Sequence, residues 1–158
     1  APKNYLSSLQ TSANVYNGFN ILVGERSGLY HFSNYNNLIT EIEAGIHGVS
    51  NALLDTPWPK LERAKSRLSE IIDQPKLEKE ELFELLRDSE KAADENLPNT
   101  GIPYDWEKAI SSIYIDRDNY GTLCSTLLLV DYDGNIEFIE RRYDPETNII
   151  ISNIAFNF

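Results

Sequence analysis

The polar residues best suited to chemistry gather in one short block, residues 45–60. Ser50 and Asn51 form a polar turn after a short apolar stretch, and the helix start Thr56-Pro57-Trp58-Pro59 follows them. Threonine as the N-cap and proline at a first helical position are typical of a helix start, and the two prolines also stiffen the chain. A rigid turn beside an asparagine can aim a polar side chain at a ligand, so the pattern predicts a site at Ser50 and Asn51.

Three neighbours in this block each have a functional and a structural interpretation. Asp55 would orient a substrate amine, or it complements the dipole of the helix that follows. Trp58 would wall a pocket for an apolar group, or it packs in the core at the helix start. His47 would ligate haem iron, or it is an ordinary hydrogen-bonded histidine of a strand. The structural interpretation is favoured for Asp55 and Trp58.

The second histidine and the single cysteine give weaker functional predictions. His31 is the second of only two histidines, and no spacing resembles a zinc site, so no metal centre is expected. Cys124 is the only cysteine, which excludes an internal disulfide and fits a reducing compartment. Because Cys124 lies in an apolar run, we expect an inert thiol in the core.

Composition restricts the function classes. The chain has 158 residues, enough for one domain with a core, and a formal net charge of −11. This acidic excess argues against binding to nucleic acid or to an anionic membrane surface. No apolar run is long enough to cross a bilayer and the first residues carry no apolar signal core, so we expect a cytoplasmic or soluble organelle protein without membrane insertion.

Hydrophobic periodicity predicts an α+β fold in which strands, then two helices, then further strands follow one another. A long apolar run at 124–132 predicts a strand covered on both faces. The strands are expected at 20–25, 29–33, 38–43, 45–50, 112–116, 124–132, 136–143 and 148–158. The helices are expected at 60–72 and 77–93, with one helical turn in 104–111 and a first helix carrying Tyr5, Leu6 and Leu9.

Three stretches also resemble one protein family. The segment 50–60, Ser-Asn-Ala-Leu-Leu-Asp-Thr-Pro-Trp-Pro-Lys, is similar to the signature of the NRDE family, which includes the transport and Golgi organisation proteins. Residues 16–23 and 120–131 are similar to the strands that precede and follow that signature, in the same order. The resemblance implies a partial Ntn-hydrolase-like αββα sandwich without its N-terminal strands, with residues 1–158 as the C-terminal portion of a single domain.

The resemblance also implies a reaction. In Ntn hydrolases the first residue is the nucleophile, and its own α-amino group acts as the base. The family carries an N-terminal cysteine and an Asn-Arg-Asp-Glu motif that these 158 residues lack, and Ala1 has no nucleophilic side chain. We therefore expect the intact protein to hydrolyse an amide or acyl bond and this chain alone to be inactive. By the same resemblance Asn51 is the oxyanion donor, and its alternative role is an Asx turn.

A second family block lies at 120–126. The family usually has an arginine after the Gly-Thr pair, where this chain has Leu123, which weakens the case for any reaction that needs the arginine. Thr122 still offers a hydroxyl there, so the expected ligand contacts are Ser50, Asp55, Trp58, Thr122 and His47.

The alternative to an enzyme is a binding or trafficking protein on the same scaffold. The Golgi-organisation branch implies haem, or another apolar ligand, as cargo and not as a catalytic cofactor. A plain interaction module is the third hypothesis. Exposed sheet edges invite pairing with another chain, so we expect a homodimer or a swapped form.

Overall fold

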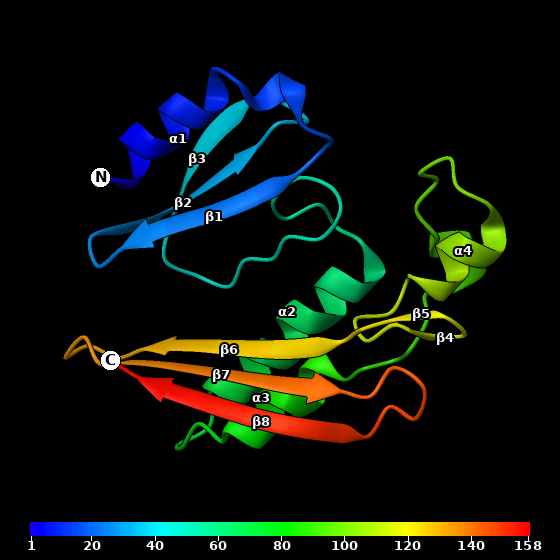
Figure 1. Cartoon of the computed structure of the whole chain (residues 1–158). Helices are drawn as coiled ribbons and strands as arrows, with labels where there is room; N and C mark the ends of the chain where they lie inside the picture. The colour runs from blue at the N-terminus through cyan, green and yellow to red at the C-terminus, as the bar shows by residue number, and fades with distance from the viewer. The chain divides into compact units, whose positions relative to one another are not determined.

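The computed structural model describes residues 1–158, which divide into two compact units, Ala1–Pro57 and Trp58–Phe158. Together they contain four α-helices and three small antiparallel sheets, which confirms the α+β class (Figure 1). None of the helices combines the length and the apolar character needed to span a membrane.

The first unit is a three-stranded antiparallel sheet with one helix on it. Strands β1 (Asn20–Glu25), β2 (Gly28–Ser33) and β3 (Leu38–Ile42) are hydrogen-bonded in that order, and α1 (Pro2–Gln10) contacts all three. A short 3₁₀ turn, η1 (Ala13–Val15), links α1 to the sheet. The core under the helix contains Leu6, Ala13 and Phe32, with Phe19, Ile21, Val23, Tyr30 and Ile39 packed against it.

The alternation of strand side chains assigns the two faces of this sheet. Ile21 and Val23 point into the core under α1, so Asn20 and Leu22 belong to the opposite face. The register places Leu22 opposite His31, and therefore His31 shares the face of Asn20. The predicted hairpin and the first three predicted strands are confirmed.

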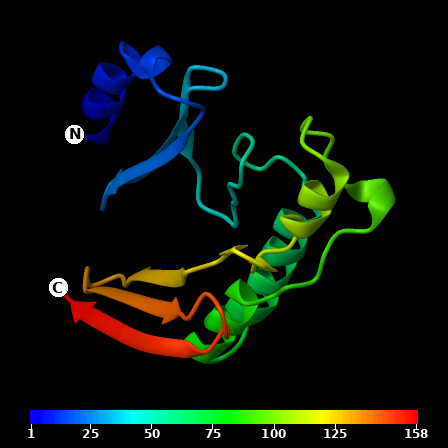
Figure 2. The same ribbon diagram turned by 45° about the vertical axis from the view of Figure 1, so that its right-hand side comes forward.

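The second unit has two helices against another three-stranded sheet. Helices α2 (Pro59–Ile72) and α3 (Lys79–Leu86) pack on one face of the sheet β6–β7–β8, as Figure 2 shows. Its strands are β6 (Cys124–Val130), β7 (Ile136–Tyr143) and β8 (Ile150–Asn157); the shorter elements are η2 (Asp94–Asn96), α4 (Tyr104–Ala109), β4 (Asp116–Arg117) and β5 (Tyr120–Gly121). The core contains Ile71, Leu82, Phe83, Leu85, Leu127 and Ile139.

Two ion pairs tie α3 to the middle strand of this sheet. The Arg141 guanidinium donates two hydrogen bonds to Glu80, 2.7 and 2.8 Å long, and lies 3.8 Å from the ring centre of Phe83. Lys79 pairs with Glu137 at 2.6 Å. The hydrogen bonds from Arg141, and to a smaller extent its charge, lower the pKa of the Glu80 carboxyl.

Within the second unit, only one face of the 124–132 strand is covered, so this unit alone does not meet the expectation of two covered faces. Leu127 of β6 is buried under the helices, whereas Leu128 is 63% exposed on the other face. In this unit the helices α2 and α3 lie on one face only, so the other, apolar face of the sheet has no helical layer of its own. Cys124 lies on that side and is an exposed thiol, which corrects its assignment to the core.

Three element predictions are wrong because hydrogen bonds lead the chain elsewhere. No strand forms at 45–50, where the chain closes a loop. The helix predicted to reach residue 93 ends at Leu86, since Asp88 pairs with Arg63 of α2 at 2.5 Å and accepts from the Glu90 N–H. Residues 112–115 do not form a strand, because Ser112 donates its hydroxyl to the Tyr114 carbonyl oxygen, and the short strand β4 begins only at Asp116.

The predicted N-cap is also wrong. Helix α2 has Trp58 as its N-cap residue and Pro59 at its first position. The Thr56 hydroxyl donates to the Leu53 carbonyl oxygen at 2.9 Å, so it stabilises the preceding turn and not the helix end.

Adjacent isoleucines test the packing of α2. Ile71 is 1% exposed and Ile72 is 50% exposed. We expect Ile71→Ala to lower the free energy of unfolding by about 2–5 kcal/mol, because it leaves a cavity in the core. Ile72→Ala is the matched control and should change it by less than about 0.5 kcal/mol. Urea denaturation of both variants measures the difference, and equal losses would contradict the assigned helix face.

Candidate functional site

The predicted site block forms a closed loop in the first unit. Asp55 donates its N–H to the Gly48 carbonyl oxygen at 2.8 Å and accepts the Gly48 N–H on Oδ1 at 3.0 Å. His47 Nδ1 lies 2.6 Å from Asp55 Oδ2. These contacts join the ends of residues 47–55, which we call the 47–55 loop. Asp55 itself has φ +55°, a left-handed conformation that aspartate tolerates better than most residues.

The tip of the loop is held from the sheet. Asn20 donates Nδ2 to the carbonyl oxygens of Ala52, at 2.8 Å, and Ser50, at 3.4 Å. The Oδ1 of Asn20 lies 2.9 Å from Nε2 of His31, which is 3% exposed. Since Oδ1 can only accept, His31 Nε2 carries the proton, an assignment that follows from the hydrogen-bond network.

Asn51 lies between those two carbonyls and is exposed. Its Oδ1 accepts a hydrogen bond from the Ser50 hydroxyl at 3.2 Å. An oxyanion hole requires the other end of the carboxamide, the Nδ2 donor, and this bond leaves that end unused. The geometry is therefore compatible with donation from Asn51 to a ligand.

His47 and Asp55 form a pair at the other end of the loop. A carboxylate only accepts hydrogen bonds, so His47 Nδ1 carries the shared proton, and in the neutral ring Nε2 has the free lone pair. The two side chains are 30% and 32% exposed. A Cβ on Gly45 would lie 3.4 Å from Nε2, so glycine at this position leaves the ring nitrogen accessible. Asp55 acts in loop closure, and neither of its two sequence interpretations anticipated that.

Two predicted site residues belong to the second unit and make structural contacts there. Trp58 is the N-cap of α2, and the Lys60 ammonium lies 5.6 Å from its ring centre. Thr122 accepts the Ile115 N–H on its hydroxyl at 2.9 Å, and its own N–H donates to the Ile115 carbonyl oxygen at 2.8 Å. The structure thus brings together His47, Ser50, Asn51 and Asp55 in one loop.

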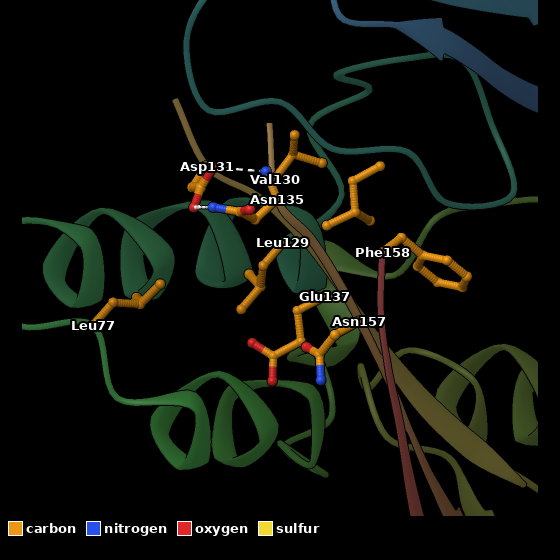
Figure 3. Close-up of a pocket in the computed structure, with 9 residues that line it drawn as sticks. Leu77, Leu129, Val130, Asp131, Asn135, Glu137, Asn157 and Phe158 are labelled. Atoms are coloured by element: carbon orange, nitrogen blue, oxygen red, sulfur yellow. Dashed lines mark hydrogen bonds between the residues drawn. The ribbon is translucent and has the colours of Figure 1, made fainter. Parts of the chain in front are cut away.

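Two pockets of the second unit are lined by none of the six predicted site residues. The larger is an open pocket of about 700 Å³ between β6, β7 and the residues after α2. Figure 3 shows the side chains of Glu137 and Asn157 directed into it, below Leu129. Hydrogen bonds from Asn135 occupy the carboxylate of Asp131 and lower its pKa. The smaller pocket, of about 210 Å³, lies beside Arg63 and Asp88.

Sequence reasoning missed Asn20 and His31 as site residues. Their strand period places them on one face of the sheet, and that signal was available. The 30-residue separation between Asn20 and Ser50 hid the contact, because nothing local indicates that the loop returns to β1.

Comparison with known proteins gives the same family as the sequence motifs. The family model described as Transport and Golgi organisation 2 matches residues 1–145. A mouse Transport and Golgi organization 2 homolog is 30% identical over 152 residues, covering 87% of this chain and 55% of the relative. The bovine and human homologs are each 28% identical with the same coverage.

These matches assign the α+β chain, with its closed 47–55 loop, to a known protein family. It belongs to the Transport and Golgi organisation 2 family, as the resemblance to the NRDE proteins predicted. The chain spans 55% of the length of the curated relatives it matches.

Burial of His31 generates a prediction about pH. Desolvation lowers the pKa of His31 below its ordinary 6.5, so the folded state keeps a neutral ring where the unfolded chain takes up a proton. Below pH 6.5 the unfolded state binds more protons, and the free energy of unfolding should fall as the pH falls. NMR titration of the His31 ring should give a midpoint below 6.5, and a higher midpoint would contradict a neutral buried ring.

Proposed function

We propose that the intact protein hydrolyses an amide or acyl bond, with Asn51 donating to the oxyanion. The observation that supports this most directly is the exposed Asn51 carboxamide on a loop tip whose flanking carbonyls are both held by Asn20. A preorganised neutral donor stabilises developing negative charge without a cost of reorganisation. The nucleophile, a cysteine in this family, would come from residues outside 1–158.

The proposed fold for this reaction is an Ntn-hydrolase-like αββα sandwich. Each unit on its own has a helical layer on one face of its sheet. In each unit the other face exposes apolar side chains, such as Leu22 and Leu38 in the first and Leu128 and Phe156 in the second. Such one-sided sheets are the layers that a sandwich requires.

The proposed chemistry is acyl transfer in two steps. The cysteine sulfur adds to the substrate carbonyl, and the carbonyl oxygen becomes the oxyanion that accepts a hydrogen bond from Asn51 Nδ2. The leaving group departs with the proton that the α-amino group took from the thiol. Water then attacks the acyl carbon of the thioester, which releases the acid and the free thiol.

Asn51→Ala tests the oxyanion role in a protein that contains this chain and its upstream residues. We expect kcat for a small amide or thioester substrate to fall about 10²–10³-fold with KM little changed, because the donor acts in the transition state. Asn4→Ala, an exposed asparagine of α1, is the matched control. An unchanged kcat in Asn51→Ala, or no labelling of the first cysteine by a thiol-directed electrophile, would refute the hydrolase proposal.

A second candidate function is binding of haem or another apolar ligand. The observation that favours haem is the His47–Asp55 pair, because metal-ligating histidines usually donate their other ring N–H to a carboxylate. The lone pair on Nε2 of His47 is then available to iron, and Gly45 leaves it uncovered.

Haemin titration separates the two candidates. We expect a shifted Soret band with the unmodified chain and its loss in His47→Ala, because the axial ligand is removed. Asn51→Ala should leave the band as in the unmodified chain, since it keeps the ring and its carboxylate. A Soret band that is the same in His47→Ala would exclude His47 as a ligand.

A further inference from the structure

We propose that Asn20 is the positioning residue of the Asn51 site, and that buried His31 sets the orientation of the Asn20 carboxamide. The inference rests on the proposed function in one respect, namely that Asn51 is the group that contacts the ligand. Asn20 itself contacts only protein groups, so its role is to place another side chain.

The argument starts from where the Asn20 hydrogen bonds end. The two carbonyls that Asn20 Nδ2 contacts belong to Ser50 and Ala52, one on each side of Asn51. Holding both flanking peptide groups restricts the backbone at Asn51, and that backbone sets the direction of its side chain. A single amide group on β1 therefore controls the aim of the exposed carboxamide.

The orientation of Asn20 depends in turn on His31. The two ends of an asparagine carboxamide are nearly the same in shape, and only hydrogen-bond partners distinguish them. His31 Nε2 donates to Oδ1 at 2.9 Å, which turns Nδ2 toward the loop. In the flipped orientation Oδ1 would face the carbonyl oxygens of Ser50 and Ala52. Both groups are hydrogen-bond acceptors, so no hydrogen bond could form between them.

Loop stability alone does not explain this arrangement. Asn51 is exposed and Ser50 only half-buried, so water can reach this part of the loop and bond to carbonyls there. A buried histidine and a half-buried asparagine on a sheet face are costly unless their hydrogen bonds are made, while apolar residues such as Leu22 occupy the same face without that cost. The specific consequence of the pair is a fixed geometry at Asn51.

Asn20→Asp tests the proposal with little change in shape. It replaces the Nδ2 donor by an oxygen that repels both carbonyls, and it gives His31 a charged partner. We expect the NMR backbone order parameters at residues 50–53 to fall from about 0.85 to below about 0.6, with a smaller change in β1 and β2. The NMR midpoint of His31 should rise, because a carboxylate stabilises the imidazolium. In a hydrolytically active protein, kcat should fall on the order of 10²-fold with KM nearly unchanged.

The matched control is Asn34→Asp in the same unit. Asn34 also donates Nδ2 to backbone carbonyls, those of Ala13 at 3.0 Å and Asn17 at 3.1 Å, but these lie outside the 47–55 loop. It should destabilise the first unit without a selective fall in the order parameters at 50–53 and without raising the His31 midpoint. If Asn20→Asp does not fold, His31→Leu serves instead, since it removes the donor to Oδ1 and keeps an apolar side chain in the buried position.

The outcomes separate the inference from the proposed hydrolysis. Unchanged order parameters at 50–53 in Asn20→Asp, or an equal fall in Asn34→Asp, would overturn the positioning role. A selective fall together with a kcat loss that Asn51→Ala does not deepen would support it. A selective fall and a raised His31 midpoint in a protein whose unmodified form hydrolyses no substrate would support the positioning by Asn20 and refute the hydrolase.

Discussion

The closure of the 47–55 loop by Asp55 is the constraint on which the candidate site depends. Asp55 uses its backbone N–H and both carboxylate oxygens, and its backbone takes a left-handed conformation. Such a conformation persists only where its surroundings determine it. Because the closure joins His47 and Gly48 to Asp55, the residues between them project as one compact loop. Without it, Ser50 and Asn51 would lie on an open connection between β3 and α2, free to adopt many conformations.

A second layer of support comes from uncharged polar groups. His31 is buried and kept neutral by desolvation, so the link from His31 through Asn20 to the loop tip places no charge inside the unit. Neutral hydrogen bonds hold geometry without the desolvation penalty of an ion pair. The other pair of the site, His47 and Asp55, is instead about one-third exposed. The candidate site thus presents a neutral donor at the tip of the loop and a basic nitrogen at its base.

The two units share a construction principle. In each, the helical layer covers one face of an antiparallel sheet and leaves the other face with exposed apolar side chains. On β6 this exposes Leu128 and Cys124, although the sequence of that strand is almost continuously apolar. Thr122, which the family block suggested as a site hydroxyl, is used to bridge to Ile115. The polar residues of the second unit therefore support its fold more clearly than they indicate a reaction.

The sequence alone determined the family, the α+β class and most of the regular elements. Residues 20–25 and 136–143 form strands with the predicted bounds, and α2 begins within one residue of its predicted start, because local periodicity and hydrophobic burial decide these elements. Tertiary structure decided the rest. Residues 45–50, 87–93 and 112–115 departed from prediction because their hydrogen bonds go to side chains or distant backbone groups and not to a helix or sheet ladder. The sequence singled out Asn51, but only the folded chain brings Asn20 to it across about 30 residues, since no local pattern encodes where a loop returns.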